Sequence, residues 1–121
     1  MVKTKRVYDA PAPDDGLRVL VDRVWPRGLT REKAGVDIWI RDIAPSSGLR
    51  KWFSHDETKW EEFRKRYFSE LDAMDGPVSE LRNIVKKTKR VTFLFGSKEE
   101  KYNNANALIE YLKKKSWCGA P

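Results

Sequence analysis

The residues with the clearest chemical potential lie in one short segment, VDRVWPRG (residues 21–28). A planar guanidinium is a fork of N–H donors that fits phosphate or carboxylate, and this segment places Arg23 and Arg27 around a Trp-Pro turn. Asp22 could orient an arginine or act as a general base. The segment therefore predicts an anion-binding site. The alternative is an ion-pair network among Asp22, Arg23 and Arg27 that clamps the turn.

A second segment with ligand-binding potential, residues 96–104, follows an apolar run and precedes a predicted helix. Backbone N–H groups and the positive end of the helix dipole would then point at one place. Ser97, Lys98 and Asn103 are the candidate anion-binding residues in it. The spacing is not that of a Walker A loop, because the second glycine is missing. The alternative is an exposed charged turn whose asparagines cap the helix.

Two further segments, KWFSHD (residues 51–56) and WIRDIAPS (residues 39–46), could contribute to the same site. An imidazole changes its charge near neutral pH, so His55 is a candidate proton shuttle beside Asp56. The alternative is a packing or capping role for His55 at a helix entrance. The other candidates repeat the Trp, Arg and Asp composition of the first segment, although core tryptophans with a surface ion pair would give the same pattern. Together with Trp25 of the first segment, the candidate pocket-lining residues are Trp39, Arg41, Asp42 and Ser46.

Two apolar runs, residues 17–24 and 91–95, must position these side chains. Uniformly apolar strands suit the centre of a sheet that is covered on both faces, so we expect the two to be adjacent and parallel. Ligands of open α/β sheets bind beyond the carboxyl ends of such strands, where both candidate segments begin. Residues 5–8 and the alternating residues 36–43 predict further extended segments.

Periodic apolar residues predict helices over residues 58–74, 77–87 and 104–115, and a shorter one over residues 30–35. For the short helix, Thr30 is the predicted N-cap and Gly35 the stop. Ser54 and Glu57 are spaced like a capping box before the first long helix, with Asp56 as a rival cap. Residues 45–48, Pro-Ser-Ser-Gly, predict a break. The fold class is therefore α/β, a small, mainly parallel sheet flanked by helices in a single domain of residues 1–121.

The formal charge of +7 and the pI near 9.6 favour acidic partners. An anionic small molecule is one such partner, and nucleic acid is another. The chain has one cysteine, Cys118, and one histidine, which excludes an internal disulfide and leaves no predicted metal site. No signal peptide and no apolar stretch near 18 residues occur, so we expect a cytoplasmic protein without a membrane segment. The basic residues available for nucleic acid are Lys86, Lys87, Lys89, Arg90 and Lys113 to Lys115.

Four motifs, VLVDRVWPRG, WIRDIAPS, LRKWFSHD and WEEFRKRY, closely resemble in this order the YeaO-like branch of domain-of-unknown-function family 488 (DUF488). The preceding KRVYDAPAPDDG resembles the opening of the same family, so the resemblance covers nearly the whole chain. It implies a compact bacterial or archaeal cytoplasmic α/β protein and no particular activity or cofactor. A distant branch has a Cys-x-Glu…Cys-His-Arg pattern after a later strand. Here that position reads FGSKE (residues 95–99), so thiol chemistry does not carry over.

Three functions are compatible with these patterns. The first is an enzyme acting on a phosphorylated or other anionic metabolite such as a nucleotide, with Arg23 and Arg27 holding the anion. The second is a nucleic-acid-binding accessory protein that uses the Lys/Arg-rich face. The third is a protein-interaction adaptor domain. A concave pocket in which Asp22, Arg23 and Ser97 converge would favour the first of these.

Overall fold

The computed structural model describes residues 1–114, and its centre is a four-stranded sheet with the order β1-β4-β2-β3. Every pair of neighbouring strands is parallel, so the carboxyl ends of the strands meet at one edge. The predicted adjacency of the two apolar runs is confirmed, with Leu17 opposite Val91 and Leu20 opposite Leu94. The strands are β1 (Val2–Arg6), β2 (Leu17–Leu20), β3 (Ile38–Trp39) and β4 (Val91–Phe95).

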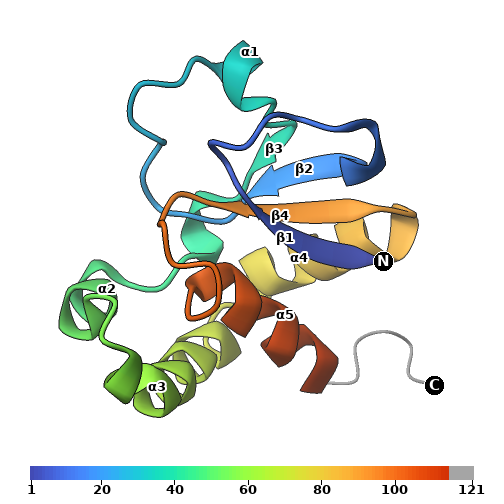
Figure 1. Cartoon of the computed structure of the whole chain (residues 1–121). Helices are drawn as coiled ribbons and strands as arrows, with labels where there is room; N and C mark the ends of the chain where they lie inside the picture. Colours follow the sequence, from blue (N-terminus) through green and yellow to red (C-terminus); the bar gives the residue numbers. More distant parts are fainter. Residues whose placement is uncertain (115–121) are drawn as a thin grey trace.

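Helices cover one face of this sheet, and the other face lies under α1 and the loop that joins β1 to β2 (Figure 1). The predicted α/β class with a small parallel sheet is therefore confirmed. None of the helices within residues 1–114 is long and apolar enough to span a membrane. The helices are α1 (Arg31–Ala34), α2 (Ser47–Phe53), α3 (Trp60–Asp72), α4 (Asp75–Lys87) and α5 (Asn104–Lys114). Short 3-10 turns occupy Pro13–Asp15, Arg41–Ile43 and Glu57–Lys59.

The two central strands supply core residues to both faces of the sheet. Side chains alternate along a strand, so Val19 and Phe93 pack among α3, α4 and α5, while Leu20 and Leu94 pack on the opposite side. All four of these side chains are fully buried. This is why β2 and β4 have no polar–apolar alternation that would mark a solvated face.

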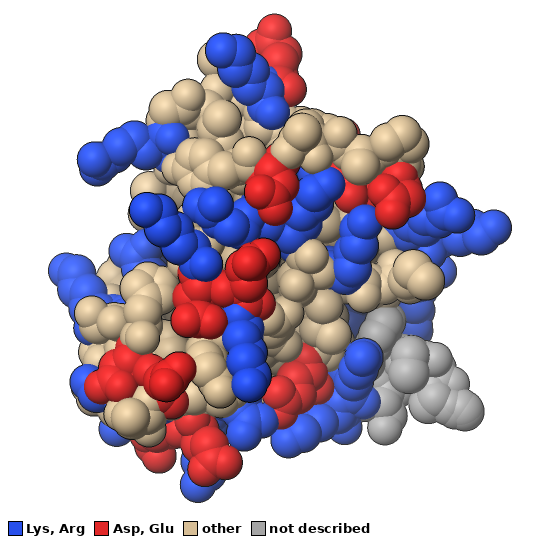
Figure 2. Space-filling model, viewed as in Figure 1, with Lys and Arg blue, Asp and Glu red and all other residues tan. Residues whose placement is uncertain are grey.

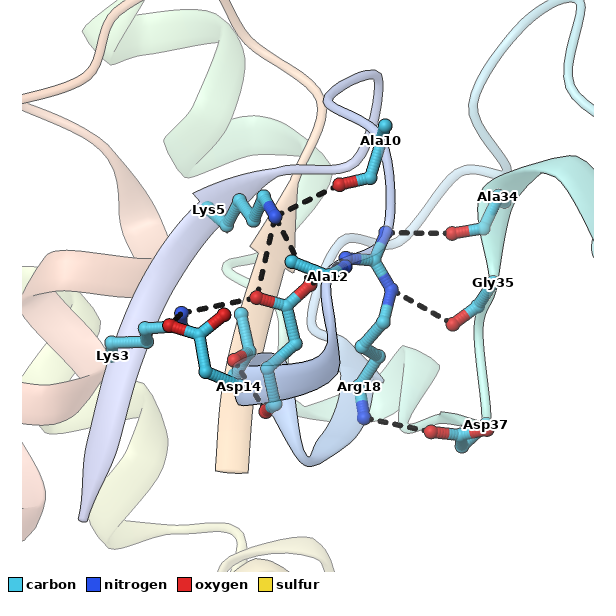
Figure 3. Close-up of polar contacts among 11 residues, drawn as sticks. Lys3, Lys5, Ala10, Ala12, Asp14, Arg18, Ala34, Gly35 and Asp37 are labelled. Atoms are coloured by element: carbon cyan, nitrogen blue, oxygen red, sulfur yellow. Dashed lines mark hydrogen bonds and ion pairs between the residues drawn. The ribbon is translucent and has the colours of Figure 1, made fainter. Parts of the chain in front are cut away.

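The face of the sheet that lies under α1, its second face, also buries a cluster of charged side chains that was not predicted from the sequence (Figure 3). Asp15 is 1% exposed and Arg18 is 4% exposed, and an Arg18 Nη1 lies 2.6 Å from an Asp15 carboxylate oxygen. The Nζ atoms of Lys3 and Lys5 each lie 3.0 Å from the same carboxylate. The Arg18 guanidinium also donates hydrogen bonds to the carbonyls of Ala34 and Gly35, at 2.8 and 2.9 Å. The cluster thus joins β1, β2, the first 3-10 turn and α1.

Several element boundaries differ from the predicted ones. The apolar run 17–24 pairs only as far as Leu20, and the first strand is Val2–Arg6 rather than residues 5–8. Of the extended segment predicted over residues 36–43, only Ile38–Trp39 forms a strand, and Arg41–Ile43 form a 3-10 turn. The segment loses its partner where β2 ends, and the following 3-10 turn directs Ile43 into the helical core, where it is fully buried.

The extended segment ends before residues 45–48, where a break was predicted, but these residues also contain the start of α2, a helix that was not predicted. The Ser46 hydroxyl oxygen accepts the Leu49 N–H there at 3.1 Å. The predicted cap at Ser54 was wrong. Ser54 ends α2 in a left-handed conformation, φ 46°, so it cannot begin the next helix. The rival cap is the one present, because an Asp56 carboxylate oxygen accepts the Thr58 N–H at 3.0 Å. The cap at Thr30 and the stop at Gly35 are confirmed. Cys118 and Lys115 lie outside the described residues.

Replacing Asp15 with Asn should destabilise the protein by about 3–5 kcal/mol at pH 7, since it leaves the buried Arg18 cation without its counter-charge. Burial alone would raise the pKa of Asp15, but the Ala12 N–H and the cations of Lys3, Lys5 and Arg18 hold it well below its usual range. A carboxylate with a lowered pKa stabilises the folded state above its unfolded pKa, and this contribution is lost as the pH falls.

Urea denaturation of both proteins between pH 3 and pH 7 measures the effect. The gap in free energy of unfolding should be full at neutral pH and shrink below about pH 4. Asp14→Asn is the matched control, because its carboxylate is mostly exposed and within 3.4 Å of the same Lys3. A gap that does not change with pH would contradict a charged, paired Asp15.

Candidate functional site

A cavity of about 250 Å³ lies at the carboxyl edge of the sheet, beyond the ends of β2 and β4. The chain leaves β2 toward α1 on one face and leaves β4 toward α5 on the other (Figure 1). Divergent connections of this kind open the crevice in which open α/β sheets bind their ligands. The lining residues are Asp22, Arg23, Ala44, Pro45, Arg50, Phe53, His55, Phe63, Gly96, Ser97, Tyr102, Asn103 and Asn104.

The Asp22 carboxylate connects the segments that meet at this cavity. One of its oxygens accepts the Gly96 N–H at 2.7 Å, and the other accepts a hydrogen bond from the Asn104 side-chain amide at 3.1 Å. The same amide donates to the Val21 carbonyl at 3.1 Å, and the Trp39 indole N–H donates to the Asp22 carbonyl at 2.7 Å. Asp22 thereby fixes the ends of β2 and β4 and the start of α5 relative to one another.

The electrostatic surroundings of Asp22 are mixed. Burial raises the pKa of its carboxyl group, and the hydrogen bonds from Gly96 and Asn104, together with the Arg50 charge, oppose that rise. Burial raises the pKa of the Tyr67 phenol much further, with the Asp22 charge adding to the effect. The Tyr67 hydroxyl donates to the Ile43 carbonyl at 2.6 Å and is fully buried. Neither group is a free acid or base at the cavity wall.

Two arginines contribute positive charge to the cavity. The Arg23 guanidinium is half-buried and is held by hydrogen bonds to the carbonyls of Ala44, at 3.1 Å, and Pro45, at 3.4 Å. Arg50 lies on α2 with its side chain exposed. Only one carboxylate, that of Asp22, is among the residues that line the cavity, so its charged groups sum to positive.

The amino terminus of α5 adds to this positive potential, because the helix dipole places partial positive charge there. Asn103 is 3% exposed, and its side-chain oxygen accepts the Asn106 N–H at 2.9 Å, which caps the helix. Its side-chain amide donates to the Glu99 carbonyl at 2.9 Å. Both the oxygen and the NH₂ group of the Asn103 side chain therefore have hydrogen-bond partners within the protein. The contribution of α5 to the cavity is mainly the positive potential of its helix dipole.

The cavity brings together five of the residues singled out from the sequence: Asp22, Arg23, His55, Ser97 and Asn103. Arg27 is exposed and is not among the lining residues. Its backbone carbonyl accepts a hydrogen bond from the Tyr8 hydroxyl at 3.0 Å. Lys98 lines a shallow neighbouring hollow with His55 and Glu99. The pairs within residues 1–114 include no ion pair among Asp22, Arg23 and Arg27, so the alternative of an ion-pair clamp is not what holds this turn.

The expected pocket-lining residues lie outside the cavity. Trp25 and Trp39 pack edge to face, with ring centroids 5.4 Å apart, against the second face of the sheet. Arg41 and Asp42 are exposed, and the Arg41 guanidinium lies 5.9 Å from the Trp39 ring centroid. Ser46 caps α2 and donates from its N–H and hydroxyl to the carboxylate of Glu70, at 2.8 and 2.6 Å. None of these five residues is among those that line the cavity.

Sequence reasoning missed several residues that line the cavity, above all Arg50. It follows a Pro-Ser-Ser-Gly segment that was interpreted only as a break, although serine is also a common N-cap residue at a helix start. Tyr102 lies in a charged segment without periodicity, so nothing marked its ring as part of a site. Within residues 1–114, no three His, Cys, Asp or Glu side chains gather into a set that could hold a metal ion.

Comparison with known proteins decides the family. The model of the inactive DUF488-N3 subclade matches residues 1–117. The chain belongs to the DUF488 family. It is 37% identical over 112 residues to the uncharacterised protein YeaO of Escherichia coli, which covers 93% of this chain and 96% of YeaO. It is 45% identical over 83 residues to an uncharacterised protein of Mycobacterium tuberculosis, or 69% of this chain and 70% of that one. No solved structure is significantly similar to the chain.

Replacing Asp22 with Asn should cost about 1–3 kcal/mol of stability, because an amide offers one acceptor oxygen where two donors now bind carboxylate oxygens. Its own NH₂ group would face the N–H of Gly96 or the amide of Asn104. Asp42→Asn makes the same charge change on an exposed side chain and should change stability by less than about 0.5 kcal/mol. Urea denaturation compares the two variants, and equal stabilities would contradict the linking role of Asp22.

Proposed function

We propose that this protein binds a small anionic molecule, a phosphorylated or carboxylated metabolite, in the cavity beyond the ends of β2 and β4. The observation that carries the proposal is the convergence of Arg23 and Arg50 with the amino terminus of α5 on one cavity. Guanidinium groups and helix amino termini both favour phosphate and carboxylate groups. A volume of about 250 Å³ lies just below the range typical of drug-sized ligands, which suits a small metabolite.

Binding without chemical conversion is the form of this function that the observations favour. The subclade whose model matches the chain is described as inactive. The candidate base, Asp22, uses both of its carboxylate oxygens to hold Gly96 and Asn104 in place. The candidate proton shuttle, His55, lies exposed at the rim. A general base needs a lone pair that is free to reach the proton it removes, and Asp22 is poorly suited to that role.

Nucleic-acid binding is a second candidate, and it rests on a different part of the molecule. The basic residues at the end of α4, just before β4 and at the end of α5 all lie at the amino end of the sheet, opposite the cavity. Lys and Arg side chains protrude at that end, on the right of Figure 2. Such a surface would bind nucleic acid with an affinity that falls steeply with salt. The residues are Lys86, Lys87, Lys89, Arg90, Lys113 and Lys114.

Phosphate should raise the melting temperature of the protein more than chloride does at matched ionic strength, because a ligand that binds only the folded state stabilises it. Arg50→Gln should weaken phosphate binding by roughly ten- to a hundred-fold, the loss expected for hydrogen bonds to a charged group. Arg23→Lys should also weaken it although the charge is kept, because lysine cannot form the two-pronged contact. Thermal melts over a phosphate titration measure all three proteins.

The matched control is Arg27→Gln, which removes the same charge from an exposed side chain outside the cavity. It should keep the full phosphate-specific shift. Equal shifts in the wild type and in Arg50→Gln would contradict the placement of the anion, and no phosphate-specific shift in the wild type would contradict the proposed function.

A further inference from the structure

Part of the cavity wall is a continuous cluster of aromatic rings. Phe53 of α2 stacks on Phe63 of α3, with ring centroids 4.4 Å apart and an interplanar angle of 29°. Trp60 stacks on Phe63 at 5.6 Å and meets Tyr102 edge to face at 5.3 Å. Phe53, Phe63 and Tyr102 line the cavity, and Trp60 packs against all three. The cluster thus joins α2, α3 and the segment after β4 beside the cavity.

The exposure of these rings divides them into support and contact surface. Phe53 and Phe63 are 5% and 2% exposed, so their rings are almost wholly used in packing. Tyr102 is half-buried, and His55, whose ring lies 6.4 Å from that of Phe53, is exposed. The Tyr102 backbone N–H donates to the Glu99 carboxylate at 3.2 Å, which holds its segment in place. Tyr102 and His55 are therefore the cavity-lining aromatic residues that packing leaves partly exposed, with the Lys101 Nζ 5.0 Å from the Tyr102 ring centroid.

We infer that the anion bound in this cavity carries a flat aromatic or heteroaromatic ring, an inference that rests on the function proposed above. The ring would stack on Tyr102 and His55, and the anionic group would meet Arg23 and Arg50. An aromatic wall offers a bare phosphate little contact and offers a sugar phosphate no ring-on-ring stacking, whereas a flat aromatic ring gains both contact area and stacking. The combination of paired arginines with stacked aromatic rings in one cavity thus selects the class of molecule, of which nucleoside monophosphates and aryl phosphates are members.

Isothermal titration calorimetry on the full chain with matched probes tests this inference. Ribose 5-phosphate carries the anion without a ring, while phenyl phosphate, AMP and UMP carry both. The ring-bearing anions should bind at least about tenfold more tightly than ribose 5-phosphate, the preference expected from one stacked ring. A further gain for AMP or UMP over phenyl phosphate would identify the ring as a nucleobase, and equal affinities would identify a general aromatic anion.

Substitution of Tyr102 locates the ring. Tyr102→Leu should remove most of the preference for ring-bearing anions over ribose 5-phosphate, and a circular dichroism spectrum that matches the wild type shows that the variant is folded. Tyr102→Phe should keep the preference. Tyr8→Leu is the control, because Tyr8 is 42% exposed and lies outside the cavity.

The outcomes separate this inference from the function on which it rests. Equal affinities of the wild type for ribose 5-phosphate and for the ring-bearing anions would overturn the inference and leave anion binding intact. Binding of none of the four probes would overturn the proposed function itself. A preference that survives in Tyr102→Leu would overturn the assignment of the ring to this wall.

Discussion

Two parallel strands that leave a sheet toward opposite faces need something to hold their ends together, and here the Asp22 carboxylate does so. It binds the N–H of Gly96 beyond β4 and the amide of Asn104 at the start of α5, while its own residue follows β2. A Cβ atom at residue 96 would lie 3.2 Å from the carboxylate oxygen, so this close approach suits glycine. The junction holds in place the ends of β2 and β4 and the start of α5, which line the cavity.

That junction removes the Asp22 carboxylate partly from water, which disfavours its charge, and neighbouring groups offset this cost. Burial raises the pKa of Asp22, yet two hydrogen bonds and the Arg50 charge favour its ionised form. On the second face of the sheet, Asp15 is also buried but is surrounded by three cations, and its pKa is lowered. One carboxylate thus stabilises the layer that covers the sheet, and the other lines a cavity whose charged side chains sum to positive.

The sequence predicted the parts of this arrangement that depend on local pattern. The apolar runs indicated that β2 and β4 are adjacent and parallel, and the strand-end position of Asp22 and Arg23 placed them correctly at the carboxyl edge. Asp15 and Arg18 were not singled out, because Asp15 lies in a Pro- and Asp-rich segment that is typical of an exposed loop. Their pairing becomes visible only when the loop folds back over the sheet.

The parts that the sequence did not predict depend on where a turn directs the chain. Pro26 and Gly28 indicate a turn, but no local rule predicts that Arg23 lines the cavity while Arg27 does not. Likewise, the Pro-Ser-Ser-Gly segment is compatible with a break or with a helix start, and the interpretation as a break left α2 and Arg50 unpredicted. The aromatic rings that line the cavity also pack in the core, and only partial exposure distinguishes Tyr102 from Phe53 and Phe63.

The most direct test of the account is a phosphate titration followed by ¹⁵N–¹H correlation NMR at constant ionic strength. If the cavity is the anion site, the amide signals of Gly96, Ser97 and Asn104 should shift and saturate together, because their N–H groups lie at the strand end and helix start that line it. Signals at Lys86, Lys87 and Arg90 should stay in place. Shifts confined to that basic end, or no saturable shift at all, would contradict the central claim that the junction at Asp22 builds a site for an anion.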